Sequence, residues 1–192
     1  MSFQIKTAEF ITSVVDDKPI LHDGKNQVAF IGRSNVGKSS VMNMLMDRRD
    51  LVKSSSTPGK TKTANFFLIN NSFYLVDLPG YGYARMSKVD RERLRELIVW
   101  FLSETPRDNR KVVLVVDAKT GLTDIDLQMI EFLQQEEIAY IIAANKTDKL
   151  NQKELHKLRV SLEEFTSLGQ QVFYVSAQKK KGRDALLDFI TA

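Results

Sequence analysis

The chain has 192 residues, a net charge of +4 and an apolar content of 43%, which fits one ordinary globular domain with a sizeable core. It contains no cysteine, so disulfides and thiolate metal sites are excluded. It has neither the basic and apolar stretches of a signal peptide nor an apolar run near the roughly 20 residues that span a bilayer. We therefore expect a soluble, cytoplasmic protein, and the mild basic excess permits an RNA partner without requiring one.

The first half of the chain alternates between strand-like and helix-like segments. Within residues 1–25, Phe3 and Ile5 alternate with polar neighbours, which suggests a short edge strand. A buried strand over 28–31 is followed by a helix over 37–46. The runs 64–69 and 73–77 read as two strands of a hairpin that turns at Asn70-Asn71.

The second half continues this alternation. Helices are predicted within 94–102, 122–133 and 155–165 and over 183–190, and strands over 112–116, 140–144 and 172–175. In the helix within 122–133, the repeating apolar face consists of Leu122, Ile125, Met129 and Leu133.

The alternation predicts an α/β fold of three layers, with helices on both faces of a mostly parallel six-stranded sheet that contains one antiparallel strand. We predict a single domain over residues 1–192, in which 1–25 form an N-terminal extension. In such sheets, ligands bind at the carboxyl ends of the strands. Each motif below directly follows a predicted strand, so we expect the motifs to converge on one edge.

Residues 32–39 match the phosphate-loop pattern G-x-x-x-x-G-K-[ST] between a strand and a helix. The glycines let the backbone curl so that its N–H groups point at phosphate oxygens, and the following helix presents its positive N-terminus. We expect Lys38 to reach the β- and γ-phosphates and the Ser39 hydroxyl to bind Mg²⁺. The alternative is a glycine-rich turn with an incidental lysine, which this placement disfavours.

The residues from Asp77 to Gly80 form a second motif, D-x-P-G, at the end of the strand 73–77. An aspartate there can hold magnesium through a water, and the Gly80 N–H can contact a γ-phosphate. The polar stretch 53–63 between the two motifs is long enough for a mobile switch loop. A threonine in it can complete the magnesium shell, and the candidates on chemistry alone are Thr57, Thr61 and Thr63.

The residues from Asn145 to Asp148 form the pattern N-K-x-D after the strand 140–144. A carboxylate here can accept hydrogen bonds from N1–H and the 2-amino group of guanine, which adenine cannot supply, so adenine would leave Asp148 desolvated and unpaired. Lys146 would lie over the base, and Asn145 would hold the loop and contact the polar edge of the base. Backbone N–H groups of residues 175–177 can donate to guanine O6.

The order of these motifs is that of a translation-factor-type GTPase. Five runs are more specific, namely Gly-Arg-Ser-Asn-Val-Gly-Lys-Ser-Ser (32–40), Thr-Pro-Gly-Lys-Thr (57–61), Asn65-Phe66-Phe67, Asp-Leu-Pro-Gly-Tyr-Gly-Tyr-Ala (77–84) and Lys-Lys-Gly (180–182). In these runs the chain resembles the bacterial EngB (YihA/YsxC) family of TrmE-Era-EngA-EngB-Septin-like GTPases, and the resemblance extends from near residue 8 to the end of the chain. One departure is the asparagine at position 145, where members often have threonine, and both residues can supply the polar contact.

By this resemblance, Thr61 is the switch threonine on the metal. The catalytic set is then Lys38, Thr61 and Gly80, and the metal set is Ser39, Thr61 and, through water, Asp77. The nucleotide-binding set is Gly32, Arg33, Ser34, Asn35, Val36, Gly37, Lys38, Ser39, Ser40, Gly59, Lys60, Thr61, Lys62, Thr63, Asp77, Leu78, Pro79, Gly80, Asn145, Lys146, Thr147, Asp148, Val175, Ser176 and Ala177.

The resemblance also implies a function. We expect a GTP-binding protein that uses GTP, GDP and Mg²⁺, acts as a nucleotide-dependent switch in large ribosomal subunit assembly and is needed for normal cell division and septation. Its expected partner is the large subunit or its precursor, through rRNA and ribosomal proteins, with no membrane or DNA partner, and the protein is expected to be a monomer. Two alternatives stay open: a P-loop small-molecule kinase, for which no acceptor site or lid is visible, and a non-catalytic, nucleotide-stabilised scaffold for division proteins.

Hydrolysis is expected to be slow and stimulated by a partner. Tyr81 follows D-x-P-G at the place where Ras-like proteins have a glutamine that orients the attacking water. Asn35 occupies the place where similar GTPases hold K⁺, so it either holds an assisting potassium ion or only caps the loop.

Two groups of side chains have alternative roles. We expect the aromatic residues Phe66, Phe67 and Phe73 in the core. A set of basic residues forms either a solvated face or an RNA contact, namely Arg85, Lys88, Arg91, Arg93, Arg95, Lys179, Lys180, Lys181 and Arg183.

Overall fold

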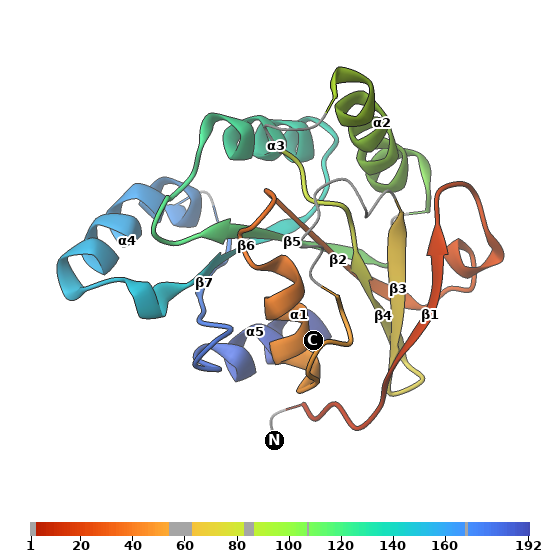
Figure 1. The fold of residues 1–192 in the computed structure, drawn as a ribbon, viewed down its shortest axis with the longest axis horizontal. Helices are drawn as coiled ribbons and strands as arrows, with labels where there is room; N and C mark the ends of the chain where they lie inside the picture. The colour runs from red at the N-terminus through yellow and green to blue at the C-terminus, as the bar shows by residue number, and fades with distance from the viewer. Residues whose placement is uncertain (1–2, 54–62, 83–86, 107, 168) are drawn as a thin grey trace.

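The computed structural model describes residues 3–53, 63–82, 87–106, 108–167 and 169–192, and its centre is a seven-stranded sheet in the order β1-β3-β4-β2-β5-β6-β7 (Figure 1). The strands are β1 (Ala8–Val14), β2 (Asn26–Gly32), β3 (Ala64–Ile69), β4 (Phe73–Asp77), β5 (Arg110–Asp117), β6 (Tyr140–Asn145) and β7 (Val172–Tyr174). The helices are α1 (Lys38–Met46), α2 (Lys88–Val99), α3 (Asp124–Gln135), α4 (Gln152–Ser167) and α5 (Arg183–Thr191), with short helical turns at Pro19–Leu21, Trp100–Glu104 and Thr147–Lys149.

The direction of the strands confirms the predicted fold class. β3 pairs antiparallel with both β1 and β4, whereas the other neighbouring strands pair parallel. One strand therefore runs against the rest of a mostly parallel sheet. The sheet has seven strands rather than six because the N-terminal segment adds β1 at its edge.

The added edge strand lies later in the chain than the alternation around Phe3 suggests. Asn70 explains this, because its side-chain oxygen accepts hydrogen bonds from the amides of Lys6 and Thr7 at 2.8 and 3.0 Å. Its side-chain nitrogen also donates to the carbonyl of Gln4 at 2.8 Å. The segment before β1 is thus fastened to the β3–β4 turn, where Asn70 and Asn71 both have a positive φ, as a tight hairpin turn requires.

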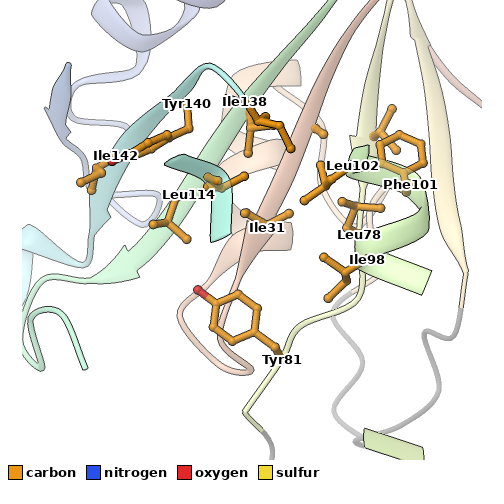
Figure 2. Packing of buried hydrophobic residues seen from close by; sticks show 14 of the residues in the cluster. Ile31, Leu78, Tyr81, Ile98, Phe101, Leu102, Leu114, Ile138, Tyr140 and Ile142 are labelled. Carbon is orange, nitrogen blue, oxygen red and sulfur yellow. The ribbon is translucent and has the colours of Figure 1, made fainter. Parts of the chain in front are cut away.

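Helices cover both faces of the sheet. Apolar residues of α2, α3 and α4 form one cluster with residues from one face of the sheet, and those of α1 and α5 form a second cluster with the other face. Figure 1 shows α2 and α3 above the sheet and α1 and α5 below it. Figure 2 shows part of the first cluster, including Ile31 of β2, Leu114 of β5 and Ile98 of α2. The three aromatic residues expected in the core, Phe66, Phe67 and Phe73, are buried.

The predicted face of α3 is confirmed in part, because Leu133 is buried and Leu122 and Met129 pack against the first cluster. Ile125 is 42% exposed, whereas the charged residue Asp126 has no exposed surface. Ile130 and Leu133 complete the buried face. The prediction is wrong at Ile125, and Asp126 is buried instead because its carboxylate finds hydrogen-bond donors inside the protein, which are described below. No helix within the described ranges is long and apolar enough to cross a membrane.

Candidate nucleotide-binding site

The predicted motifs meet at the carboxyl edge of the sheet. β2 pairs with β4 and β5, and β5 pairs with β6, so the segments that follow these parallel strands leave the sheet on the same side. Phe30 of β2 lies opposite Asp77, and Asp117 of β5 lies opposite Asn145. The phosphate-loop, D-x-P-G and N-K-x-D motifs are therefore neighbours, as their sequence positions predict.

The phosphate loop, residues 32–39, needs both of its glycines for reasons of space. A side chain at Gly32 would collide with the Val115 carbonyl, and one at Gly37 would collide with the side-chain amide of Asn145. Gly37 also has a left-handed φ of +93°, which glycine adopts without strain. The loop leads directly into α1, so the helix N-terminus faces the place where phosphates would bind. Val36 is buried, whereas Ser40 is exposed.

Lys38 and Asp77 form a buried ion pair between the phosphate loop and the end of β4. The pair places Asp77 beside the loop that also carries the Ser39 hydroxyl. Carboxylate and hydroxyl oxygens suit Mg²⁺, which commonly keeps several waters and shares phosphate oxygens in nucleotide sites. The residues therefore fit a magnesium ion held by Ser39 and, through water, by Asp77. Leu78 and Pro79 are buried, so the middle of the D-x-P-G motif packs inside the protein.

The predicted switch residues are only partly described. Thr63 lies within the described residues, and its hydroxyl donates to the Asn65 side chain at 3.0 Å. Thr57, Gly59, Lys60, Thr61 and Lys62 lie outside them. Gly80 lies against the phosphate loop, because a Cβ atom at this position would be 3.2 Å from the Ser34 Cα.

Asn145 joins three parts of the site. Its side-chain nitrogen donates to the Val36 carbonyl at 3.0 Å, and its side-chain oxygen accepts from the Ala177 amide at 3.1 Å. The prediction that Asn145 holds the loop is confirmed. The Ala177 amide, expected to face guanine O6, is engaged by Asn145 in this structure.

Lys146 is held by a residue that the sequence analysis missed. Its ammonium group contacts the Asn35 carbonyl at 2.6 Å and the Asp117 carboxylate at 2.7 Å. Partial burial alone would raise the pKa of Asp117, but hydrogen bonds from Lys146 and from the Lys119 amide outweigh it and leave that pKa below its ordinary value. Since Asp117 ends β5, the rule that functional groups follow parallel strands could have identified it.

Asp148 is exposed at the mouth of the site, where it can meet a ligand. One of its carboxylate oxygens accepts a hydrogen bond from the Ser176 hydroxyl. Thr147 is buried and ties the motif to the last strand segment, because its hydroxyl donates to the carbonyl of Val175 at 2.9 Å. The base motif and residues 175–177 therefore form one unit.

Tyr81 points into the protein, towards α3. Tyr81 is 7% exposed and belongs to the first apolar cluster (Figure 2). Its hydroxyl donates to Asp126 at 3.0 Å. Arg33 Nε donates to the same carboxylate at 2.9 Å. Burial, followed by the charge and the hydrogen bond of Asp126, raises the pKa of Tyr81 far above its ordinary value, so the phenol stays protonated. Asp126 was also missed, although Thr123 and Asp126 match the capping-box pattern.

The basic cluster near the base motif is partly structural. Arg183 donates to the carbonyls of Met44 and Leu45, both at 2.9 Å, and so caps the end of α1. Lys180 forms an exposed ion pair with Asp47 at the same helix end. Arg183 therefore belongs to the packing of α1 against α5, whereas Lys179 and Lys181 are exposed.

Two family models match the chain. The model described as a 50S ribosome-binding GTPase matches residues 27–146, and the model described as the elongation factor Tu GTP binding domain matches residues 105–192. A probable GTP-binding protein EngB from Clostridium acetobutylicum is 42% identical over 189 residues, which cover 97% of this chain and 94% of that protein. A protein of the same description from Clostridium beijerinckii is 43% identical over 188 residues, which cover 96% and 94% of the two chains.

Solved structures agree with these matches. The crystal structure of a probable GTP-binding protein engB superposes with a TM-score of 0.63 at 28% identity, over 86% of this chain and 92% of that one. Aquifex aeolicus Era bound to GDP and AlF4⁻ superposes with a TM-score of 0.69 at 23% identity, over 85% of this chain and 55% of that one. The likeness to Era shows the fold alone.

Proposed function

The chain belongs to the EngB family of GTP-binding proteins and carries a GTPase domain, and from this premise we propose that it is a GTP-driven switch in the assembly of the large ribosomal subunit. The observation that carries the switch is the close approach of Gly80 to Ser34, because it brings the last residue of D-x-P-G against the phosphate loop. The description of the matching family model, a 50S ribosome-binding GTPase, supports the large subunit as the partner.

The chain's own residues divide the work of nucleotide binding. The phosphate-loop amides and Lys38 bind the phosphates, and Asp148 binds the guanine edge. Asn145 and Lys146 hold the two loops at a fixed separation through Val36 and Asn35. Mg²⁺ would be held by Ser39 and, through water, by Asp77, and Thr61 would complete its coordination shell. When bound, the ion would neutralise phosphate charge.

A switch requires that the partner distinguish the two nucleotide states. In this proposal Gly80 and Thr61, the latter expected from the sequence resemblance alone, sense the γ-phosphate, and loss of that phosphate changes the contacts of the segments that adjoin them. A partner shifts such an equilibrium only by its differential affinity, so the ribosomal subunit must bind the GTP form better than the GDP form. An effect on cell division and septation would then follow from impaired ribosome assembly.

Intrinsic hydrolysis is slow in this proposal, because Tyr81 is buried against Asp126 and cannot orient a water. Potassium beside Asn35 can supply part of the missing charge stabilisation. Asn35 has a φ of +69°, which asparagine tolerates better than most residues, so the loop conformation alone also favours asparagine. Measuring the single-turnover rate in K⁺ and in Na⁺ tests whether Asn35 holds a potassium ion or only shapes the loop. Equal rates in the two salts would exclude the role of potassium.

Co-sedimentation with purified large subunits tests the main proposal. The protein is incubated with subunits in GDP or in a non-hydrolysable GTP analogue, over a series of salt concentrations. We expect more protein in the pellet with the analogue, and a steep loss as salt rises if basic side chains contact rRNA. Lys38→Ala is the control, because it should lose the dependence on nucleotide.

Two outcomes would contradict parts of this proposal. Equal sedimentation in both nucleotides would exclude the switch and favour a nucleotide-stabilised scaffold. A flat response to salt would exclude the rRNA contact and leave ribosomal protein as the binding surface.

A further inference from the structure

A buried carboxylate on α3 collects four hydrogen bonds from three parts of the chain. Asp126 accepts from Arg33 Nε at 2.9 Å, from the Tyr81 hydroxyl at 3.0 Å, and from the amide and hydroxyl of Thr123 at 3.0 and 2.8 Å. Arg33 lies in the phosphate loop, and Tyr81 is the residue that follows D-x-P-G. Asp126 therefore connects α3 to the phosphate loop through Arg33 and to the segment after D-x-P-G through Tyr81.

The two connected segments are also joined through their backbones. The Tyr81 amide donates to the Gly32 carbonyl at 3.2 Å, and the Ser34 amide donates to the Tyr81 carbonyl at 2.9 Å. Between them, Gly80 is so close to Ser34 that an added Cβ would be 3.2 Å from two of its backbone atoms. The backbone that follows Gly80 is consequently held where Tyr81 is held.

Stability alone is a poor explanation for this arrangement. The desolvation of a buried ion pair offsets much of its attraction, and apolar replacements are often as stable. Asp126 has no exposed surface, so this carboxylate is fully withdrawn from water. A buried pair of this kind is better explained by what it positions.

We propose that Asp126 is a positioning residue that anchors Tyr81 and Arg33 and thereby holds the Gly80 amide in place for a γ-phosphate. This inference rests on the proposed GTP-dependent function of the site, although not on the ribosomal partner. A preorganised amide costs no ordering when the ligand arrives, so the anchor strengthens GTP binding and hydrolysis. GDP has no γ-phosphate for Gly80 to contact, so GDP binding gains little from the anchor.

Three variants separate positioning from the capping of α3. Tyr81→Phe removes only the hydroxyl that meets Asp126, and Asp126→Asn weakens the whole cluster. Thr123→Ala is the matched control, because it removes the capping hydroxyl while leaving Tyr81 and Arg33 on the carboxylate. For each purified variant, the Kd of GDP, the Kd of a non-hydrolysable GTP analogue, the single-turnover rate and the thermal midpoint are measured.

We expect Tyr81→Phe and Asp126→Asn to weaken binding of the analogue roughly tenfold, the effect of losing one hydrogen bond to a charged group. GDP affinity should stay within about twofold of wild type, as for any contact made only with the γ-phosphate. Thr123→Ala should lower the thermal midpoint without changing the ratio of the two Kd values. The variant that combines Tyr81→Phe with Asp126→Asn should bind the analogue no more weakly than Asp126→Asn alone, because both substitutions break the same connection.

If Tyr81→Phe leaves the ratio of the two Kd values, for the GTP analogue and for GDP, unchanged, the proposal is overturned, even if Asp126→Asn unfolds. An equal shift of the ratio in Thr123→Ala would assign the effect to helix capping instead. Failure of the ribosomal proposal is recognised separately, in wild-type protein, by sedimentation that does not depend on nucleotide.

Discussion

The side-chain nitrogen of Asn145 lies 3.0 Å from the carbonyl oxygen of Val36, so the base motif is fastened to the phosphate loop. The two loops are 109 residues apart in sequence, yet a base and its phosphates must meet both at a fixed spacing. Gly37 makes this contact feasible, because any side chain there would occupy the place of the Asn145 amide. The spacing is thus set by the protein before nucleotide arrives.

Replacing Gly37 by alanine should break this fastening. The added methyl group collides with the Asn145 amide and forces a left-handed φ on alanine, so we expect GDP affinity to fall by roughly 10- to 100-fold. Gly24→Ala is the control, since Gly24 has a φ of +77° and no atom within 4 Å of an added Cβ. Titration of a fluorescent GDP analogue measures both, and an equal loss in the two variants would show that backbone strain alone is responsible.

Asp148→Asn should change which base is preferred. An amide can donate to the 2-oxo group of xanthine but cannot accept from both guanine donors, so GDP should bind about 100-fold more weakly while xanthosine diphosphate gains. Ser176→Ala is the companion variant, because it removes the hydroxyl that contacts Asp148 and keeps the carboxylate. Ser176→Ala should weaken GDP binding modestly and leave the preference for guanine over xanthine unchanged. Competition between the two diphosphates decides the assignment, which fails if Asp148→Asn retains wild-type GDP affinity.

The ion pair between Asp117 and Lys146 should contribute to stability in a pH-dependent way. The pKa of Asp117 is lower in the folded protein than its ordinary value of about 3.9, so its contribution is complete above about pH 4 and is lost as the pH falls through the folded pKa. Asp117→Asn should therefore be less stable than wild type at pH 7, and the difference should shrink towards pH 3. Urea unfolding at several pH values measures this.

Asp16→Asn serves as the control for this pH dependence, because Asp16 and Lys18 form an exposed pair that should contribute little. A difference between Asp117→Asn and wild type that stays constant from pH 7 to pH 3 would show that the carboxylate charge is not responsible.

Arg183→Met tests whether this arginine is structural. It removes two hydrogen bonds to the end of α1, so we expect a loss of about 1–3 kcal/mol in the free energy of unfolding. Arg95→Met is the control, since the Arg95 side chain is 75% exposed and pairs only loosely with Glu92, at 3.6 Å. Should Arg183→Met keep its stability but lose affinity for ribosomal subunits, Arg183 would instead be an RNA contact.

Local patterns in the sequence predicted most of the fold. The hairpin strands 64–69 and 73–77 match β3 and β4, because two short apolar runs joined by a two-asparagine turn specify a hairpin without help from distant residues. The edge strand β1 was misplaced, since its position depends on Asn70, more than sixty residues away. Such a contact leaves no periodic signal near the N-terminus.

The candidate site divides in the same way. Lys38, Asp77, Asn145 and Asp148 were predictable because fixed spacing and a preceding strand define their motifs. Asp126 was not predicted, because apolar periodicity treats a charged residue as exposed and cannot anticipate four internal donors. The position of Asp117 after a predicted strand marks it as a candidate, but its partner Lys146 follows a different strand, and the sheet order shows that these two strands are neighbours.

The fastening of residues 4–7 to the β3–β4 turn has a consequence for handling the protein. This turn lies at the amino end of β4, opposite the edge where β2, β4 and β6 end, and Phe3 is further tied to Asp188 of α5 at 2.9 Å. A dye, affinity tag or surface linker placed before Phe3 would therefore project from the side remote from Lys38 and Asp148. Immobilised protein should then present its nucleotide edge freely to a particle as large as a ribosomal subunit.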